Sequence, residues 1–138
     1  MMEEKKKVIA LIAHDQKKLE MVQWANFNRK ILANYNLVGT YTTATQIFKS
    51  TGLQVEYFEP KEYSSGPKGG DFLVGAEILR GNVDIMIFFI DPDSSHPHSM
   101  DINALIRIAA LRNIPYALNR ATADAIIISE SCTDNKEK

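Results

Sequence analysis

The chain has 138 residues, of which 45% are hydrophobic and 24% are charged, so one domain with a single substantial core is expected. The formal net charge of −1 argues against the strongly basic surface of a nucleic-acid-binding protein. Only one cysteine, Cys132, is present, which excludes an internal disulfide and favours a reducing, cytoplasmic setting. The first apolar run, Val8 to Ala13, is too short for a signal peptide or a membrane span.

The first half of the chain alternates between strand-like and helix-like segments. Residues 8–12 are apolar throughout, which predicts a buried strand. Residues from about 16 to 33 predict a helix with one apolar face. Weaker strands are expected at 37–39 and 54–58, on either side of a short helix over about 43–50. The apolar face of the long helix carries Met21, Trp24, Ala25 and Leu32.

The second half repeats the alternation after a polar loop over residues 59–70. A helix is expected over about 71–80, and the strongest strand signal covers 83–90. Asp101 precedes a further apolar helix, and a short strand is expected at 116–118. Residues 122–128 fit either a short helix or a strand. We expect a charged tail over residues 1–6, one domain over 7–129, and a polar tail over 130–138. The polar composition begins near Ser129, and this end of the chain is expected to be frayed.

This order of elements predicts an α/β domain with a central parallel sheet and helices on both faces. Ligands bind such sheets at the carboxyl ends of the strands. Each of the five predicted strands is followed by a cluster of polar residues, so a single site at that edge is expected. The clusters are His14-Asp15, Thr40 to Thr43, the glycine-rich loop ending at Asp71, Asp91 to His98, and Asn119 to Asp124.

The run Ser65-Gly66-Pro67-Lys68-Gly69-Gly70-Asp71 is the most distinctive of these clusters. Glycines let the backbone approach a ligand closely, and a helix start offers unpaired N–H groups to an anion. The layout indicates a phosphate cradle beside a carboxylate. The alternative is a surface turn followed by an aspartate that caps the next helix.

Two further clusters suit an anion. Thr40, Thr42 and Thr43 offer hydroxyl groups before a helix, as phosphate sites do, although an ordinary helix cap would use the same residues. Lys18 lies one helical turn beyond His14-Asp15 and can reach an anion at the helix start. The alternatives are a capping Asp15 and a solvated lysine.

The histidines and aspartates between residues 91 and 101 admit three interpretations. His96 and His98 with nearby carboxylates suit a divalent metal. The same groups suit metal-free acid–base catalysis, with His98 oriented by a carboxylate. The third interpretation is an Asp-Pro turn with exposed histidines. No dinucleotide or Walker A fingerprint is present.

These segments, in this order, resemble the methylglyoxal synthase family over about residues 7 to 129. The most specific part is the combination of a Gly-Pro-x-Gly-Gly-Asp string with a later Asp-Pro and a Pro-His-x-x-Asp string. The matching strings are Ala10 to Asp15, Thr40-x-Thr42-Thr43, Ser65 to Asp71, Phe88-Phe89-x-Asp91-Pro92, Pro97-His98-x-x-Asp101 and Asn119 to Asp124.

The resemblance implies a Rossmann-like domain, assembled as a homohexamer, that converts dihydroxyacetone phosphate to methylglyoxal and inorganic phosphate. It implies no metal and no organic cofactor, and phosphate is both product and candidate regulator. No nucleic acid or membrane partner is implied. By position, Asp71 resembles the general base and His98 the group that polarises the carbonyl, with Asp91 and Asp101 as supporting carboxylates. The residues that resemble the binding pocket are His14, Asp15, Lys18, Thr40, Thr42, Thr43, Ser65 and Gly66.

The chain also departs from the family pattern. Tyr41 and Ala44 stand where glycines are usual, and Phe72-Leu73 replace polar residues after the base. Residues 59–63 look like an insertion. A non-catalytic module, like the effector-binding domain of carbamoyl-phosphate synthetase, is therefore an alternative of the same fold. A metal-dependent phosphohydrolase using His96, His98 and the nearby aspartates is a third hypothesis.

Overall fold

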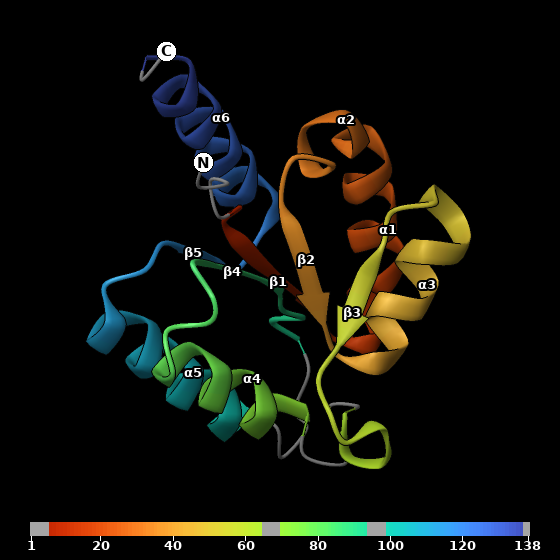
Figure 1. The fold of residues 1–138 in the computed structure, drawn as a ribbon. Coiled ribbons are helices and arrows are strands. Elements are labelled where there is room, and N and C mark those ends of the chain that lie inside the picture. Colours follow the sequence, from red (N-terminus) through yellow and green to blue (C-terminus); the bar gives the residue numbers. More distant parts are fainter. Residues whose placement is uncertain (1–5, 65–69, 94–98, 137–138) are drawn as a thin grey trace.

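A computed structural model describes residues 6–64, 70–93 and 99–136, and the chain forms a five-stranded sheet between two layers of helices (Figure 1). The strands are β1 (Val8–Ala13), β2 (Asn36–Gly39), β3 (Val55–Tyr57), β4 (Ile85–Phe89) and β5 (Tyr116–Ala117). The helices are α1 (Lys18–Phe27), α2 (Arg29–Leu32), α3 (Tyr41–Thr51), α4 (Gly70–Leu79), α5 (Ser99–Arg112) and α6 (Arg120–Lys136), with short 3-10 turns η1 (Asp15–Lys17) and η2 (Lys61–Tyr63).

The strand order is β3-β2-β1-β4-β5, and every neighbouring pair is parallel. The chain first builds outward from β1 to β3, and then returns to add β4 and β5 on the other side of β1. All strands therefore end at one edge of the sheet, as the alternation of strands and helices predicts. From β1 the chain adds strands on one side of the sheet, and from β4 it adds β5 on the other side. The carboxyl ends of β1 and β4 are therefore the topological switch point, where ligands bind in sheets of this kind.

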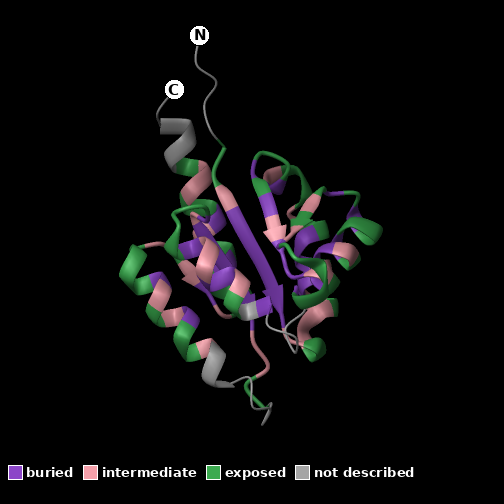
Figure 2. Cartoon of the chain, turned by 60° about the horizontal axis from the view of Figure 1, so that its bottom comes forward, coloured by how far each residue is buried: buried purple, intermediate pink, exposed green. Residues whose placement is uncertain are grey.

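The two faces of the sheet carry separate apolar layers. One face is covered by α1, α3 and α6 through side chains such as Trp24, Ile47 and Ile127. The other face is covered by α4 and α5 through Val74 and Leu105. β1 and β4 lie between the layers and are buried almost throughout, which Figure 2 shows as the purple strand through the centre. Strands buried on both faces need continuous apolar sequence, and both strands have it.

The predicted long helix over residues 16–33 is wrong in one respect, because it breaks at Asn28. The Asn28 backbone N–H and its side-chain amide both donate to the Trp24 carbonyl, at 3.0 and 2.9 Å. An asparagine that bonds its own backbone competes with the helix, so the chain turns and restarts as α2. The predicted inner face is confirmed: Met21, Trp24, Ala25 and Leu32 are all buried.

Of the two alternatives for residues 122–128, the structure has the helix. The expectation of a frayed tail from Ser129 is wrong, because α6 continues to Lys136. Two contacts hold α6 in place. The Trp24 indole N–H donates to Asp124 Oδ1 at 2.8 Å, and Lys7 forms an ion pair with Glu130 at 2.7 Å. Within the described ranges, no helix is long and apolar enough to cross a membrane.

Candidate active site

The carboxyl ends of β1 and β4 are joined directly at the switch point. Ala13 pairs with Phe89, and the His14 N–H continues the ladder to the Phe89 carbonyl at 3.1 Å. The Asp91 N–H then donates to His14 Nδ1 at 2.8 Å, although these residues lie 77 positions apart. The structure thus brings together His14 and Asp91, two of the predicted site residues.

This hydrogen bond determines which nitrogen of His14 carries the proton. An imidazole that accepts a bond at Nδ1 presents Nε2–H as its donor. The ring is also held from one side, because it meets Phe88 edge-on with centroids 5.2 Å apart. His14 is therefore a half-buried donor with a fixed orientation at the edge where parallel sheets of this kind bind ligands.

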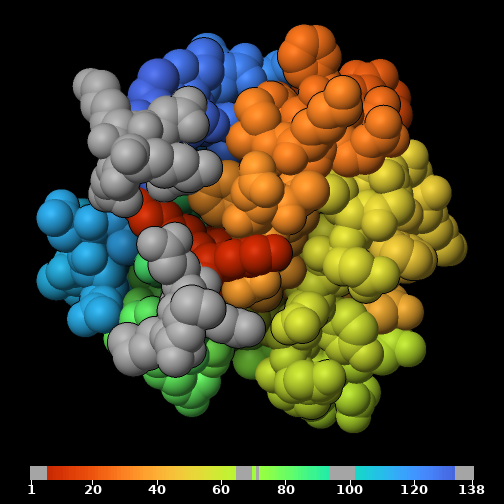
Figure 3. All heavy atoms as spheres, turned by 45° about the horizontal axis from the view of Figure 1, so that its top comes forward, coloured from red at the N-terminus to blue at the C-terminus, as the bar shows by residue number. Residues whose placement is uncertain are grey.

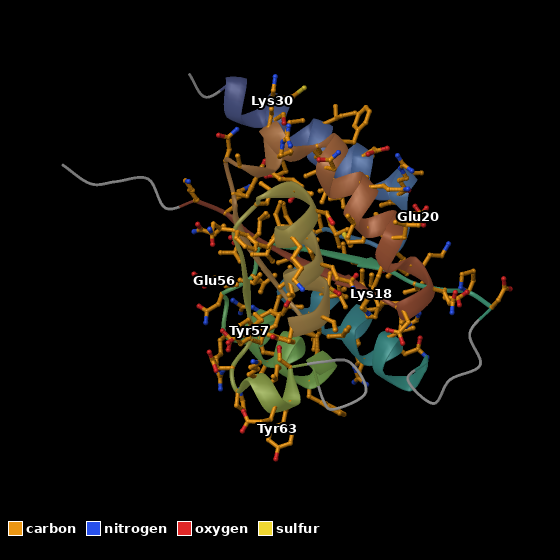
Figure 4. The ribbon with its side chains drawn as sticks, turned by 90° about the vertical axis from the view of Figure 1, so that its right-hand side faces the viewer. Lys18, Glu20, Lys30, Glu56, Tyr57 and Tyr63 are labelled. Atoms are coloured by element: carbon orange, nitrogen blue, oxygen red, sulfur yellow. The ribbon has the colours of Figure 1, made fainter. Side chains whose placement is uncertain are left out.

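Lys18 is held at the same edge by two contacts. Its Nζ donates to the Ala13 carbonyl at 3.0 Å and to Asp15 Oδ1 at 2.9 Å. The Lys18 side chain is 16% exposed whereas that of Asp15 is 84% exposed, so the cation is enclosed while its partner faces solvent. Lys18, marked in Figure 4, is the first residue of α1. Lys18 is therefore not a fully solvated charge, and its anion-binding role stays a prediction.

The N-terminus of α3 follows β2 at this edge. Thr40 and Thr43 are almost fully buried, and the Thr40 hydroxyl lies 3.2 Å from the Thr43 hydroxyl. Thr40 occupies the cap position, as the alternative predicts, but its side chain makes no capping hydrogen bond to a helix N–H group. A role of this helix end in binding an anion stays a prediction. Thr42 is exposed.

Two predicted carboxylates lie in the first turns of helices. α4 begins at Gly70, so Asp71 is inside the helix and is not the residue that caps it. The expectation that Asp101 precedes the next helix is wrong, because α5 begins at Ser99 and Asp101 is its third residue. Negative charge is favourable in the first turn of a helix. The Asp71 and Asp101 side chains, and Ser65, Gly66, His96 and His98, lie outside the described part of the structure.

Asp91 and the last polar cluster also have structural contacts. Asp91 Oδ1 accepts the Asp93 N–H at 3.0 Å, as in the predicted Asp-Pro turn. Asn119 Oδ1 accepts the Thr122 N–H at 2.9 Å and so caps α6. Together with the Asp124 bond to Trp24, this gives two residues of the Asn119–Asp124 cluster a role in anchoring α6.

Ser64 was not singled out by sequence reasoning. It is fully buried, and its Oγ has no hydrogen-bond partner among the described residues. Its position directly before the glycine-rich loop was the only signal in the sequence. Among the described residues, no three His, Cys, Asp or Glu side chains are grouped as they would be to hold a metal ion.

Comparison with known proteins decides the family. A profile of the MGS-like domain matches residues 20–118. The chain is 44% identical to a methylglyoxal synthase of Clostridium acetobutylicum over 133 residues, covering 96% of this chain and 88% of that protein. The chain belongs to the methylglyoxal synthase family. A Leptospira interrogans methylglyoxal synthase is 46% identical, covering 96% of this chain and 86% of that protein.

A solved structure supports the same family assignment. The crystal structure of methylglyoxal synthase from Elizabethkingia anophelis NUHP1 matches with a TM-score of 0.80 and 40% identity, covering 88% of this chain and 77% of that chain. The predicted family and fold class are therefore confirmed.

The orientation of His14 can be tested by NMR. We expect long-range ¹H–¹⁵N spectra near neutral pH to show His14 as the Nε2–H tautomer, because Nδ1 accepts the Asp91 amide. The chain has three histidines, so His14→Gln assigns the signal by its loss. An Nδ1–H tautomer, or rapid averaging between the two, would contradict the bond.

Proposed function

We propose that this protein is a carbon–oxygen lyase that converts dihydroxyacetone phosphate to methylglyoxal and inorganic phosphate. The observation that carries the proposal is the His14–Asp91 hydrogen bond at the switch point, with enclosed Lys18 beside it, in a chain of the methylglyoxal synthase family. These groups supply a fixed donor and a fixed cation. The N-terminus of α3 adds a third anion-binding element at the same edge.

The chemistry balances without a further reactant. A base removes a proton from the hydroxymethyl carbon beside the carbonyl, and the electron pair forms an enediolate. Protonation of the central oxygen gives the enediol. Loss of the proton from the terminal hydroxyl then forms the aldehyde, the double bond shifts to the phosphate-bearing carbon, and the carbon–oxygen bond to phosphate breaks. Protonation of the resulting enol at its terminal carbon gives methylglyoxal. Negative charge develops on the enediolate oxygen and on the leaving phosphate. Preorganised hydrogen-bond donors stabilise both charges.

We assign the acid–base roles by the resemblance. Asp71 is the base, and His98 polarises the carbonyl and moves protons between the enediol oxygens. Asp91 and Asp101 support these groups, and His14 and Asp15 line the pocket. The other predicted site residues bind the phosphate group. They are Lys18, Thr40, Thr42, Thr43, Ser65 and Gly66. The positive end of α3 and the Lys18 ammonium both favour a leaving dianion.

Replacement of the base tests the function most directly. Asp71→Asn keeps the shape of the side chain but cannot accept the proton, so we expect kcat to fall by at least about a hundredfold. Methylglyoxal and phosphate should be followed together after treatment of the enzyme with a chelator. Wild type should release both in equal amounts.

The control is Asp134→Asn, which removes the same charge far along α6 and should leave kcat unchanged. Full activity of Asp71→Asn would overturn the assigned base. Binding of phosphate esters by wild type without turnover would favour the non-catalytic module instead. Activity lost on chelation would favour the metal-dependent phosphohydrolase.

The phosphate role of Lys18 has a matched control in the adjacent residue. Lys18→Met removes a charge-assisted hydrogen bond, and we expect the KM for the substrate to rise by about tenfold or more. Lys17→Met should leave KM unchanged, because Lys17 pairs with Glu20 on the surface at 3.4 Å. Equal effects of the two substitutions would show that only overall charge matters.

We also propose that the chain assembles as a homo-oligomer, a hexamer by the resemblance. β3 is an edge strand, and a groove of about 1120 Å³ lies between α4 and the β2–β3 side of the sheet. Its lining is partly apolar, with Val38, Tyr57 and Leu73 among the side chains. In Figure 3 the red, orange and yellow segments that line it meet on one face. A second copy on this face would shield both the edge and the groove.

Light scattering of the purified chain measures the assembly. We expect a mass six times that of the 15.5 kDa chain. A monomer mass at micromolar concentration would contradict the assembly without bearing on the chemistry.

A further inference from the structure

The first residue of α3 contacts both β3 and the turn over residues 61–64 through its side chain. Tyr41 is the first residue of α3, and its ring meets the Tyr57 ring edge-on with centroids 5.0 Å apart. Lys61, in η2, places its Nζ 4.8 Å from the centre of the Tyr41 ring. We call Tyr41, Tyr57 and Lys61 the aromatic brace. Its members come from α3, from β3 and from the segment that looks like an insertion.

A backbone contact joins the same two segments. The Tyr41 N–H donates to the Ser64 carbonyl at 3.2 Å, and the Ser64 N–H donates to the Lys61 carbonyl at 3.1 Å. Ser64 is therefore fixed against the first turn of α3 by the turn that carries Lys61. The contact at this point matters because Thr40 and Thr42, in the assigned phosphate set, flank Tyr41 in sequence.

Ser64 has an unused hydrogen-bonding group. Its residue is 0% exposed, yet its Oγ bonds to none of the described residues. Buried hydroxyl groups are nearly always hydrogen-bonded, and exceptions call for an explanation. A hydroxyl that becomes bonded only when a phosphate ester is present would explain this one.

We propose that the aromatic brace positions Ser64 against the N-terminus of α3 and thereby sets the affinity of that helix end for a phosphate ester. The inference rests on the proposed function, since it takes the substrate phosphate as the ligand. The three brace residues are positioning residues. They hold the turn in place before binding, so that less ordering has to occur when the ligand binds.

The size of the effect follows from the contacts. An edge-to-face aromatic pair and an exposed cation–π contact each correspond to about a twofold to tenfold change in an equilibrium constant. Loss of the Tyr41 ring removes both contacts at once. The backbone bond from Tyr41 to Ser64 is retained in any variant except proline, so the turn is loosened rather than released.

The experiment compares binding and turnover in variants of the full chain. For Tyr41→Ala we expect the Kd of inorganic phosphate, measured by calorimetry, and the KM for dihydroxyacetone phosphate to rise by about tenfold. The same variant should keep kcat within about twofold, because the brace touches no reacting group. Tyr41→Phe keeps the ring and should bind like wild type.

Lys61→Met tests whether Lys61 acts through its contact with the Tyr41 ring or only through its positive charge. Lys61 is exposed, so this variant folds even if Tyr41→Ala does not, and we expect phosphate to bind about threefold more weakly. The double variant should bind no more weakly than Tyr41→Ala alone, because Lys61 acts through the ring. Additive losses would point to long-range charge and would overturn the brace.

Tyr63→Ala is the matched control within the same turn. Tyr63 is 58% exposed, and Figure 4 shows its ring pointing away from the protein, so phosphate affinity should not change. A lower melting temperature for Tyr41→Ala with unaltered phosphate affinity would assign the brace to stability alone and overturn the proposal. If wild type binds phosphate but turns over no substrate, the proposed function fails, and the binding comparison still decides the brace.

Discussion

The pairing of β1 with β4 is the constraint on which the rest of the structure depends. Both strands are buried between the two helical layers, so their backbone groups must bond to each other. The register runs from Ile9 opposite Ile85 to Ala13 opposite Phe89. A slip of one residue would turn every buried side chain to the opposite layer. The same register leaves His14 and Asp91 side by side where the strands end.

The proposed phosphate-binding half of the site lies at the same edge but is built from other elements. Lys18 is held by the last carbonyl of β1, whereas Thr40 and Thr43 belong to the start of α3. Two positive features, a side-chain cation and a helix end, thus come from separate elements and point to one class of ligand. The aromatic brace adds residues that depart from the family pattern, and it gives the 59–63 segment a contact with α3.

Pattern-based expectations succeeded where local sequence decides the outcome. The continuous apolar runs of β1 and β4 identify buried strands, and the inner face of α1 follows from its spacing. They failed where a single side-chain contact decides. The break at Asn28 involves a local bond from its side chain to the Trp24 carbonyl, which the spacing of apolar residues does not indicate. α6 is held by contacts from Asp124 and Glu130 to Trp24 and Lys7, which lie far away in the sequence and outside any short-range pattern.

The sequence by itself determined the fold class and the edge of the sheet at which the polar clusters follow the strands. These follow from the period of apolar residues and from the rule that parallel strands end together. Only the tertiary structure decided the tautomer of His14, the enclosure of Lys18 and the burial of Ser64. The tautomer of His14 depends on Asp91, which lies 77 positions away. The burial of Lys18 and Ser64 depends on the elements packed around them, and this packing exists only once the sheet has formed.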